Sequence, residues 1–96
     1  MPDAPLSPVP RTIDFDDFAT RRYKRVKGGI SDGGVVISDQ EAWNVVRRQQ
    51  AAIDKNLAKL GMAPPELMRA MGDAVDVANK TMDAENRRLI QLLTGK

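Results

Sequence analysis

The sequence predicts a mainly α-helical protein, organised around an antiparallel two-helix hairpin with a coiled-coil-like seam. Apolar residues between positions 39 and 93 recur at alternating steps of three and four, the spacing that lines one face of a helix. The two runs are joined by a short, proline-containing link at residues 61–65, which favours helices that fold back on each other. A chain of 96 residues buries a small share of its surface, so we expect modest stability without a partner.

Residues 1–20 are expected to form an extended, proline-rich N-terminal arm. Pro2, Pro5 and Pro8 recur at a period of three, which places them along one edge of a polyproline II helix. An arm of this composition is either a flexible tail or a segment that lies on a neighbouring surface. In the second case, Leu6 and Val9 are expected to contact the partner.

Two phenylalanines stand among acidic residues at the end of the arm. Phe15 and Phe18 are three residues apart, which suits either one helical turn with both rings on one side or an extended anchor. In both cases the rings are the best contact points of the arm. The neighbouring aspartates could face a hard cation, but the ligand spacing and glycine turn of a calcium loop are missing, so we predict no metal site.

Residues 21–27 carry five cations around one tyrosine. Such a block can neutralise phosphates while the ring stacks on a base. The alternative is that the cations pair with the acidic arm or with an acidic surface of another subunit. The net charge of +2 is too small for bulk electrostatics alone to hold a nucleic acid. The candidate contacts are Arg21, Arg22, Tyr23, Lys24, Arg25 and Lys27.

The glycine-rich segment 28–34 predicts a turn. A phosphate-binding P-loop requires a lysine and a hydroxyl residue after its last glycine, whereas Val35 follows Gly34. We therefore expect a Gly-rich turn or a short β-hairpin, in which Asp32 and Gly33 connect strands near 23–27 and 35–37. Residues 21–38 thus form a connecting unit, and the helical hairpin takes residues 39–96.

Both helices of the hairpin have recognisable ends. Ser38 and Glu41 form a capping box before the first helix, Pro65 suits the first turn of the second, and Gly95 lies just past its end. The expected seam of the first helix consists of Trp43, Val46, Gln50, Ile53, Leu57 and Leu60. That of the second consists of Met68, Met71, Val75, Ala78, Met82, Glu85, Leu89 and Leu92.

Two polar residues interrupt these apolar stripes. Gln50 and Glu85 occupy seam positions, where a buried polar side chain often fixes the register or the oligomeric state. The alternative is that the seam is wet at these points. Either way, they are the least apolar positions of the expected interface between the helices.

A symmetric fold-back predicts the register of the hairpin. Residues whose numbers sum to about 125 are expected to pair, which leaves the last turns of the second helix with no residue of the first beside them. Their aliphatic side chains then need cover from residues 35–37, from a second copy or from another protein. With the arm, they give the expected partner-binding residues: Leu6, Val9, Phe15, Phe18, Leu89, Ile90, Leu92 and Leu93.

Composition argues against an enzyme. The chain has no cysteine and no histidine, which removes disulfides, thiol chemistry, zinc ligation by these residues and histidine acid–base catalysis. No nucleophile–base pair stands out, so we expect no catalytic residues and no cofactor. No apolar run reaches the length of a membrane span and no secretory signal is recognisable, so we expect a soluble protein, cytoplasmic or within a virion or other large assembly.

These observations predict a non-enzymatic structural or assembly subunit. We expect it to dock through its arm and helical hairpin into a homo- or hetero-oligomeric complex of protein subunits, such as a phage virion, as a head–tail or tail component, or a secretion-type assembly. One alternative is a small regulatory factor that binds one protein, like a phage-encoded inhibitor or an antitoxin. The other is a nucleic-acid accessory protein that uses the basic block.

Overall fold

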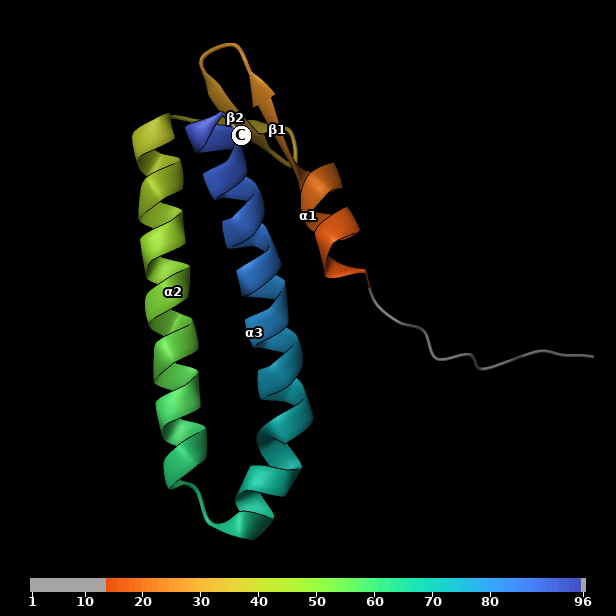
Figure 1. The fold of residues 1–96 in the computed structure, drawn as a ribbon, viewed down its shortest axis with the longest axis vertical. Coiled ribbons are helices and arrows are strands. Elements are labelled where there is room, and N and C mark those ends of the chain that lie inside the picture. The colour runs from red at the N-terminus through yellow and green to blue at the C-terminus, as the bar shows by residue number, and fades with distance from the viewer. Residues whose placement is uncertain (1–13, 96) are drawn as a thin grey trace, which may run out of the picture.

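The computed structural model describes residues 14–95 as a mainly helical protein with three helices and a small three-stranded antiparallel sheet. Helices α2 and α3 lie side by side and antiparallel, the sheet lies across one end of the pair, and α1 lies beside α3 (Figure 1). We call the two ends of the pair the sheet end and the loop end. The elements are α1 Phe15–Arg22, β1 Tyr23–Val26, β2 Gly29–Asp32, β3 Val35–Ile37, α2 Asp39–Met62 and α3 Pro65–Thr94.

Helix α1 occupies a segment that was expected to be extended. Asp14 caps it by accepting a hydrogen bond of 3.0 Å from the amide of Asp17, and acidic residues in the first turn and arginines in the last suit the helix dipole. The prediction of an extended arm is therefore wrong for residues 15–20, and the helical alternative is confirmed. Residues 1–13, including Leu6 and Val9, lie outside the described residues.

The glycine-rich segment forms two tight turns rather than one. Residues 27–28 join β1 to β2, and Gly33 and Gly34 join β2 to β3. Both predicted strands are present, but the prediction that they pair with each other is wrong, because β2 lies between them. At φ +151°, Gly29 lies so close to β3 that an added Cβ would be 2.0 Å from the carbonyl oxygen of Ile37. Only glycine fits there, and this close approach pins the start of β2 against the end of β3.

The predicted ends of the two long helices are confirmed. Ser38 and the amide of Glu41 form one half of a capping box, and the Glu41 carboxylate accepts from the amide of Ser38 in the other, both at 3.1 Å. Pro65 is the first residue of α3, and Gly95 closes it in the left-handed conformation at φ 76°. These are local rules of helix initiation and termination acting on short stretches of sequence.

The predicted register between the helices is wrong. Side chains of Gln49 and Glu85 bond at 2.6 Å, and those of Asn56 and Asn79 bond at 3.1 Å, so the paired numbers sum to about 134 rather than 125. The fold-back is not symmetric, because the first turns of α3 extend below the end of α2 (Figure 1). The stretch of α3 without a neighbour in α2 is thus at the loop end, not at the C-terminal end.

The core lies at the sheet end and covers the last turns of α3. Tyr23, Ile30, Ala42, Val46 and Leu89 form one buried cluster, around which half-buried side chains pack. The prediction that the first helix offers these turns no neighbour is therefore wrong, and Leu89 is 0% exposed. Ile37, from the segment predicted as one possible cover, packs against the same cluster. The half-buried side chains at its margin are Ile37, Trp43, Val45, Leu92 and Leu93.

Candidate functional site

A cluster of charged side chains lies beside this core, where α1 ends. The Arg22 guanidinium donates to Asp32 at 2.7 Å and pairs with the carboxylate of Glu85, whose other oxygen accepts from Gln49 at 2.6 Å. Glu85 is buried, so the wet-seam alternative is wrong, and its charge is stabilised by Arg22 and Gln49. The other expected polar seam residue, Gln50, is exposed and bonds to Asp54 on its own helix.

Tyr23 is the aromatic side of this cluster. Burial first, and then the negative charge of Glu85, raise the pKa of its phenol to about 12. The guanidinium of Arg22 lies 5.1 Å from the ring centroid, a distance suited to a cation–π contact. Because the ring is almost fully buried, Tyr23 is not placed to stack on a base of a bound nucleic acid.

Arg25 ties the sheet to both long helices. Its guanidinium donates to the carbonyl of Gly29 at 3.1 Å, to the carboxylate of Asp39 at 2.7 Å and to the carbonyl of Leu92 at 3.0 Å. A cation at the last carbonyls of a helix is favourable, and Arg25 supplies one to α3. The hydrogen bond from Arg25 to Asp39 lowers the pKa of the Asp39 carboxyl.

The predicted basic block is therefore divided among different tasks. Arg22 and Arg25 serve contacts within the chain, and Arg21 forms an exposed pair with Asp17 at 3.2 Å. Only Lys24 and Lys27 of the five cations project from the sheet without an ion pair among residues 14–95. Contact of this block with phosphate stays a prediction, and the expectation of pairing with the acidic segment is met by Arg21.

The two phenylalanines of α1 lie at an open hollow against α3. It has a volume of about 370 Å³ and is lined by Phe15, Phe18 and Val77 together with charged residues of α1. Phe18 is more exposed than Phe15. Their expected role as partner contacts stays a prediction.

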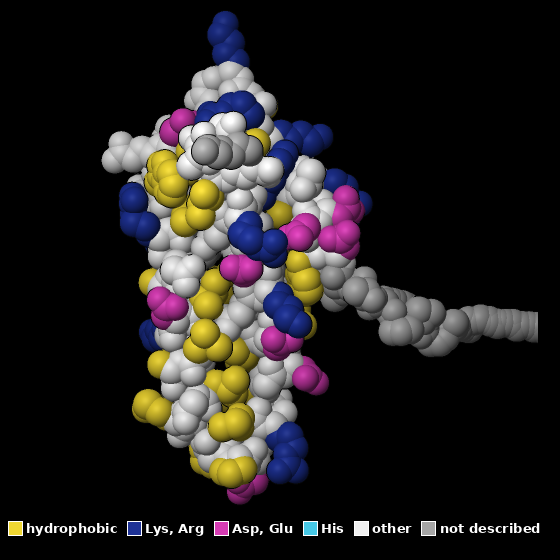
Figure 2. Space-filling model, in the orientation of Figure 1, with side chains coloured by type: hydrophobic (Ala, Val, Ile, Leu, Met, Phe, Trp, Pro, Cys, Tyr) yellow, Lys and Arg dark blue, Asp and Glu magenta, His cyan; other side chains and the backbone are white. Residues whose placement is uncertain are grey.

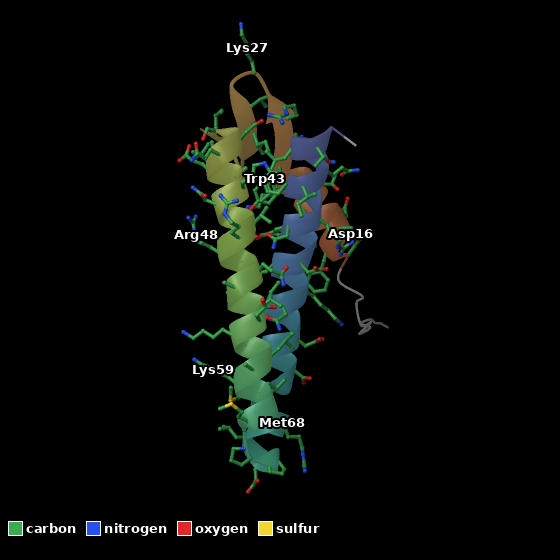
Figure 3. The ribbon with its side chains drawn as sticks, turned by 60° about the vertical axis from the view of Figure 1, so that its left-hand side comes forward. Asp16, Lys27, Trp43, Arg48, Lys59 and Met68 are labelled. Atoms are coloured by element: carbon green, nitrogen blue, oxygen red, sulfur yellow. The ribbon has the colours of Figure 1, made fainter. Side chains whose placement is uncertain are left out.

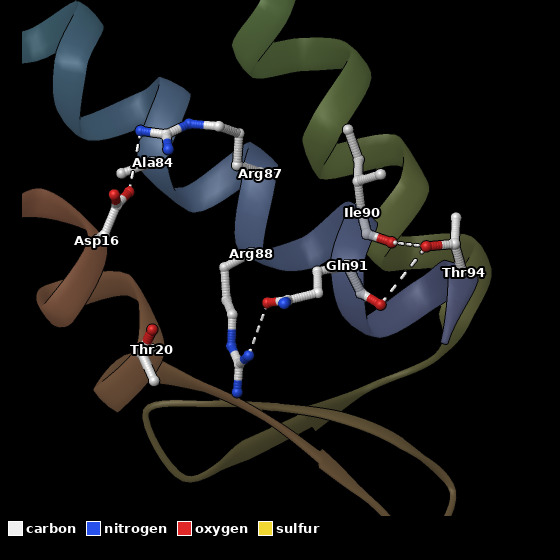
Figure 4. Close-up of a pocket in the computed structure, with 8 residues that line it drawn as sticks. All are labelled: Asp16, Thr20, Ala84, Arg87, Arg88, Ile90, Gln91 and Thr94. Atoms are coloured by element: carbon white, nitrogen blue, oxygen red, sulfur yellow. Dashed lines mark hydrogen bonds and ion pairs between the residues drawn. The ribbon is translucent and has the colours of Figure 1, made fainter. Parts of the chain in front are cut away.

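A second hollow, of about 440 Å³, lies on the other side of the contact between α1 and α3 (Figure 4). Its cations are already engaged. Arg87 pairs with Asp16 at 2.9 Å and with Asp83 at 3.1 Å, while Arg88 donates to Gln91 at 2.9 Å and to the carbonyl of Tyr23. The guanidinium groups that line the hollow are thus engaged within the chain. Ile90, which also lines it, is the most exposed member of the predicted helix-end set.

The loop end carries the largest exposed apolar side chains of the hairpin. No residue from 54 to 83 is buried, and Figure 2 shows apolar side chains along the groove between the helices and around the loop. Met62 is 83% exposed. We define the loop-end patch by the exposed large apolar residues near the loop: Leu57, Met62, Leu67 and Met68.

Sequence reasoning missed both the loop-end patch and the polar residues that set the register. Leu57 and Met68 were assigned to the seam, whereas Gln49, Asn56 and Asn79 were not singled out. The available signal was their spacing: Gln49 and Asn56 stand seven residues apart, on the same helix face as Ile53. A polar side chain at that spacing is compatible with either a seam or a solvent face, so spacing alone does not separate the two.

Among residues 14–95, no group of three or more acidic side chains is placed to hold a metal ion. Within the same range, none of the helices is long and apolar enough to cross a lipid bilayer. Comparison of the chain with protein-family models, curated proteins and solved structures gives no match.

Proposed function

We propose that the protein is a non-enzymatic docking subunit that enters a multi-protein complex through the loop end of its helical hairpin. The observation that carries this proposal is the loop-end patch, at which Leu57 and Met62 are 55% and 83% exposed. The assemblies suggested by the sequence, a phage virion or a secretion apparatus, stay predictions.

The distribution of packing along the hairpin supports a docking role. The sheet end holds the buried core and the ionic cluster, while residues 54–83 contain no buried side chain. The pairing of α2 with α3 leaves the first two turns of α3 without a neighbour in α2. One end therefore supplies the stability, and the other presents apolar surface of the kind that marks a protein-interaction site.

The chemistry of the patch suits a protein partner. Methionine and leucine side chains bury large apolar areas, and the flexible thioether adapts to the shape of a partner surface. Met62 and Met68 lie on either side of the loop, and Leu67 projects from the first turn of α3. A groove or helix face of another protein is the surface that such a tip fits.

Site-specific photo-crosslinking in the cells that carry the gene tests this proposal. A photoreactive amino acid at Met62 should crosslink to one protein, and the same group at Lys27, at the far end of the molecule (Figure 3), should not. The purified partner should then bind the wild-type chain, and the variant Met62→Gln/Met68→Gln should bind at least about tenfold more weakly, because two buried methionines are lost from the contact.

The sheet offers a matched control for that measurement. Val35 and Val36 are 66% and 54% exposed on β3, so Val35→Thr/Val36→Thr likewise replaces two exposed apolar side chains by polar ones, at the opposite end. This variant should bind like wild type. Equal affinities for the two double variants, or a crosslinked protein that does not bind the purified chain, would refute docking through the loop end.

A further inference from the structure

Helix α3 carries a second apolar stripe that faces neither α2 nor the core. Five of its members recur at steps of three and four, which places them on one face of the helix, and Ala78 lies beside Val77 at the edge of that face. All but Thr81 are exposed. No charged residue interrupts them. We call this set the outer stripe: Leu67, Ala70, Ala74, Val77, Ala78 and Thr81.

The order of residues along α3 shows what borders this stripe. Val75 and Met82 follow stripe residues and lie on the face of α3 that carries Asn79, which bonds to Asn56 of α2. The charged residues that precede stripe members therefore lie on the far side of the stripe from α2: Glu66, Arg69, Asp73, Asp76 and Lys80. Lys80 is paired with Asp76 at 3.0 Å, so the two other carboxylates outnumber the one remaining cation and give this border a net negative charge.

The acidic border continues onto α1. Asp14 and Asp17 line the hollow that also contains Val77 and Thr81 of the outer stripe. Asp17 is shared with Arg21, whereas Asp14 caps α1. From the loop end to α1, carboxylates therefore outnumber cations along this edge of the stripe.

The opposite border of the same face is basic. Its cations each stand one position before a residue of α2 on the side of α3: Arg48, Lys55 and Lys59. In α3, members of the outer stripe likewise stand one position before residues on the side of α2. Two antiparallel helices are related by a pseudo-two-fold axis perpendicular to their plane. Residues that stand one position before the facing residues of each helix therefore lie on the same face of the pair. Figure 3 shows Arg48 and Lys59 on the same side of α2, pointing away from α3. None of the three has an acidic partner among residues 14–95.

We propose that the outer stripe binds a second copy of this chain, with both loop ends at the same end of the dimer. An apolar strip with one basic edge and one edge of net negative charge is self-complementary across a two-fold axis parallel to the helices, because that axis sets each basic edge against the negative edge of the other copy. The reversed dimer sets α2 against α2 and opposes basic edges. Charge therefore selects the parallel arrangement.

The heights of the charges agree with this arrangement. The bond between Asn56 and Asn79 places Lys55 near the level of Asn79, and Lys59 one turn closer to the loop. Asp17 lies at the hollow beside Val77 and Thr81, and Asp73 is one turn below Val77. A parallel two-fold axis keeps residues of both copies at equal heights, so the lysines of one copy meet the aspartates of the other.

Sedimentation equilibrium of the full chain tests whether the outer stripe is the dimer interface. Wild type should dimerise, and Ala74→Glu should weaken dimerisation at least about tenfold, because it buries a charge at the two-fold axis. Ala51→Glu is the matched control: it adds the same charge at an exposed position of α2 away from this face, and should leave the dimer unchanged. A wild-type chain that is monomeric at 100 μM, or equal effects of both variants, would overturn the inference.

A charge exchange tests the edges. Lys59→Glu and Asp73→Lys should each weaken the dimer by about fivefold, since two symmetric copies of a surface pair are lost, and the double variant should recover most of the loss. Losses that simply add would show that these residues do not face each other.

The orientation has its own measurement. A spin label on Lys27→Cys, in a chain without other cysteines, reports the separation of the two sheet ends without touching the stripe. The parallel dimer should give one distance well below the length of α3, which is about 45 Å for 30 residues. A distance beyond that length would mean a head-to-tail dimer and refute the arrangement.

This inference rests on the proposed function in taking the hairpin for a docking element, but the two fail separately. A monomer whose Met62 still binds a partner overturns the dimer alone. A parallel dimer whose loop-end variants bind that partner like wild type overturns docking through the loop end alone.

Discussion

Gln49 of α2 donates a hydrogen bond of 2.6 Å to Glu85 of α3, and the other oxygen of that carboxylate pairs with Arg22 at the end of α1. One carboxylate is thus held by residues 36 and 63 positions away in the sequence. A buried charge that loses its partners is costly, so this contact fixes how far the three helices can slide past one another.

Glu85→Ala is expected to destabilise the protein by about 2–4 kcal/mol, because Arg22 and Gln49 lose their partner beside the core. The value is at the low end for a buried pair, since Arg22 is itself partly exposed. Urea denaturation followed by circular dichroism measures the change. Gln50→Ala, at the adjacent exposed position, should cost less than about 0.5 kcal/mol, and a comparable loss in both would contradict the role of Glu85.

The gradient of packing along the hairpin predicts unequal costs for two similar truncations. Ile53→Ala removes a buried side chain and should cost about 2–4 kcal/mol, whereas Met71→Ala acts in the half-buried, loop-end part and should cost about 1 kcal/mol. Ala52→Ser should be near neutral. Thermal melts of the three variants at a concentration that keeps them monomeric provide the comparison, and equal losses at 53 and 71 would argue against a poorly packed loop end.

Gly29 is expected to be irreplaceable in the sheet. Gly29→Ala places a Cβ 2.0 Å from the carbonyl oxygen of Ile37 at φ +151°, so the turn of the chain must shift and β3 must detach. The loss should be visible as missing amide cross-peaks of β2 and β3 in NMR spectra. Gly61→Ala, where an added Cβ meets nothing within 4 Å inside a helix, should instead stabilise by about 0.5–1 kcal/mol.

The raised pKa of the Tyr23 phenol predicts that the protein loses stability at alkaline pH. The phenol has a pKa of about 12 in the folded protein and 10.0 ordinarily, so the unfolded chain loses its proton first. The contribution of Tyr23 is complete below pH 10 and is lost as the pH rises toward 12, which amounts to about 3 kcal/mol in all. As Tyr23 is the sole tyrosine, absorbance at 295 nm reports its ionisation directly.

The control for that titration is Tyr23→Phe, which should lack the part of the alkaline decline that belongs to the phenol. Denatured wild type should titrate near pH 10. Ionisation near pH 10 in the folded protein would mean that the ring is not buried against α3.

The division of the basic block predicts weak binding to nucleic acid. With Arg22 and Arg25 engaged inside the chain, replacing Lys24 and Lys27 by glutamine removes the remaining unpaired charge of the block within the described residues. We expect no mobility shift of DNA or RNA by wild type at 150 mM salt, and any shift at low salt should vanish in Lys24→Gln/Lys27→Gln. A salt-resistant complex would restore the nucleic-acid alternative.

The ends of the helices were predictable because their signals are local. Ser38 with Glu41, Pro65 and Gly95 each act within four residues of the boundary that they set. The strand at residues 29–32 was missed because two glycine turns lie only four residues apart and resemble one long turn. In a segment so short, pairing with neighbours decides the strand, not its own composition.

The register and the fate of the arginines were not predictable in the same way. A repeat of three and four residues fits several alignments of two helices, and bonds such as that between Asn56 and Asn79 choose among them. Likewise, Arg21 and Arg22 are indistinguishable in sequence, yet only the second reaches Glu85, 63 residues later. Both outcomes depend on contacts that form only in the folded chain.

The hydrogen bond from Arg88 to the carbonyl of Tyr23 joins residues 65 positions apart in the sequence. The buried cluster likewise joins Leu89 to Tyr23, near the other end of the described chain. During synthesis, Tyr23, Ile30 and Val46 therefore emerge from the ribosome long before the residue that covers them. Co-translational folding of the sheet should wait for the last turns of α3, and until then the nascent chain has an apolar sheet face open to chaperones. Arrested chains that stop before residue 85 should accordingly be cleaved by protease throughout, whereas chains released after Leu93 should be protected at the sheet end.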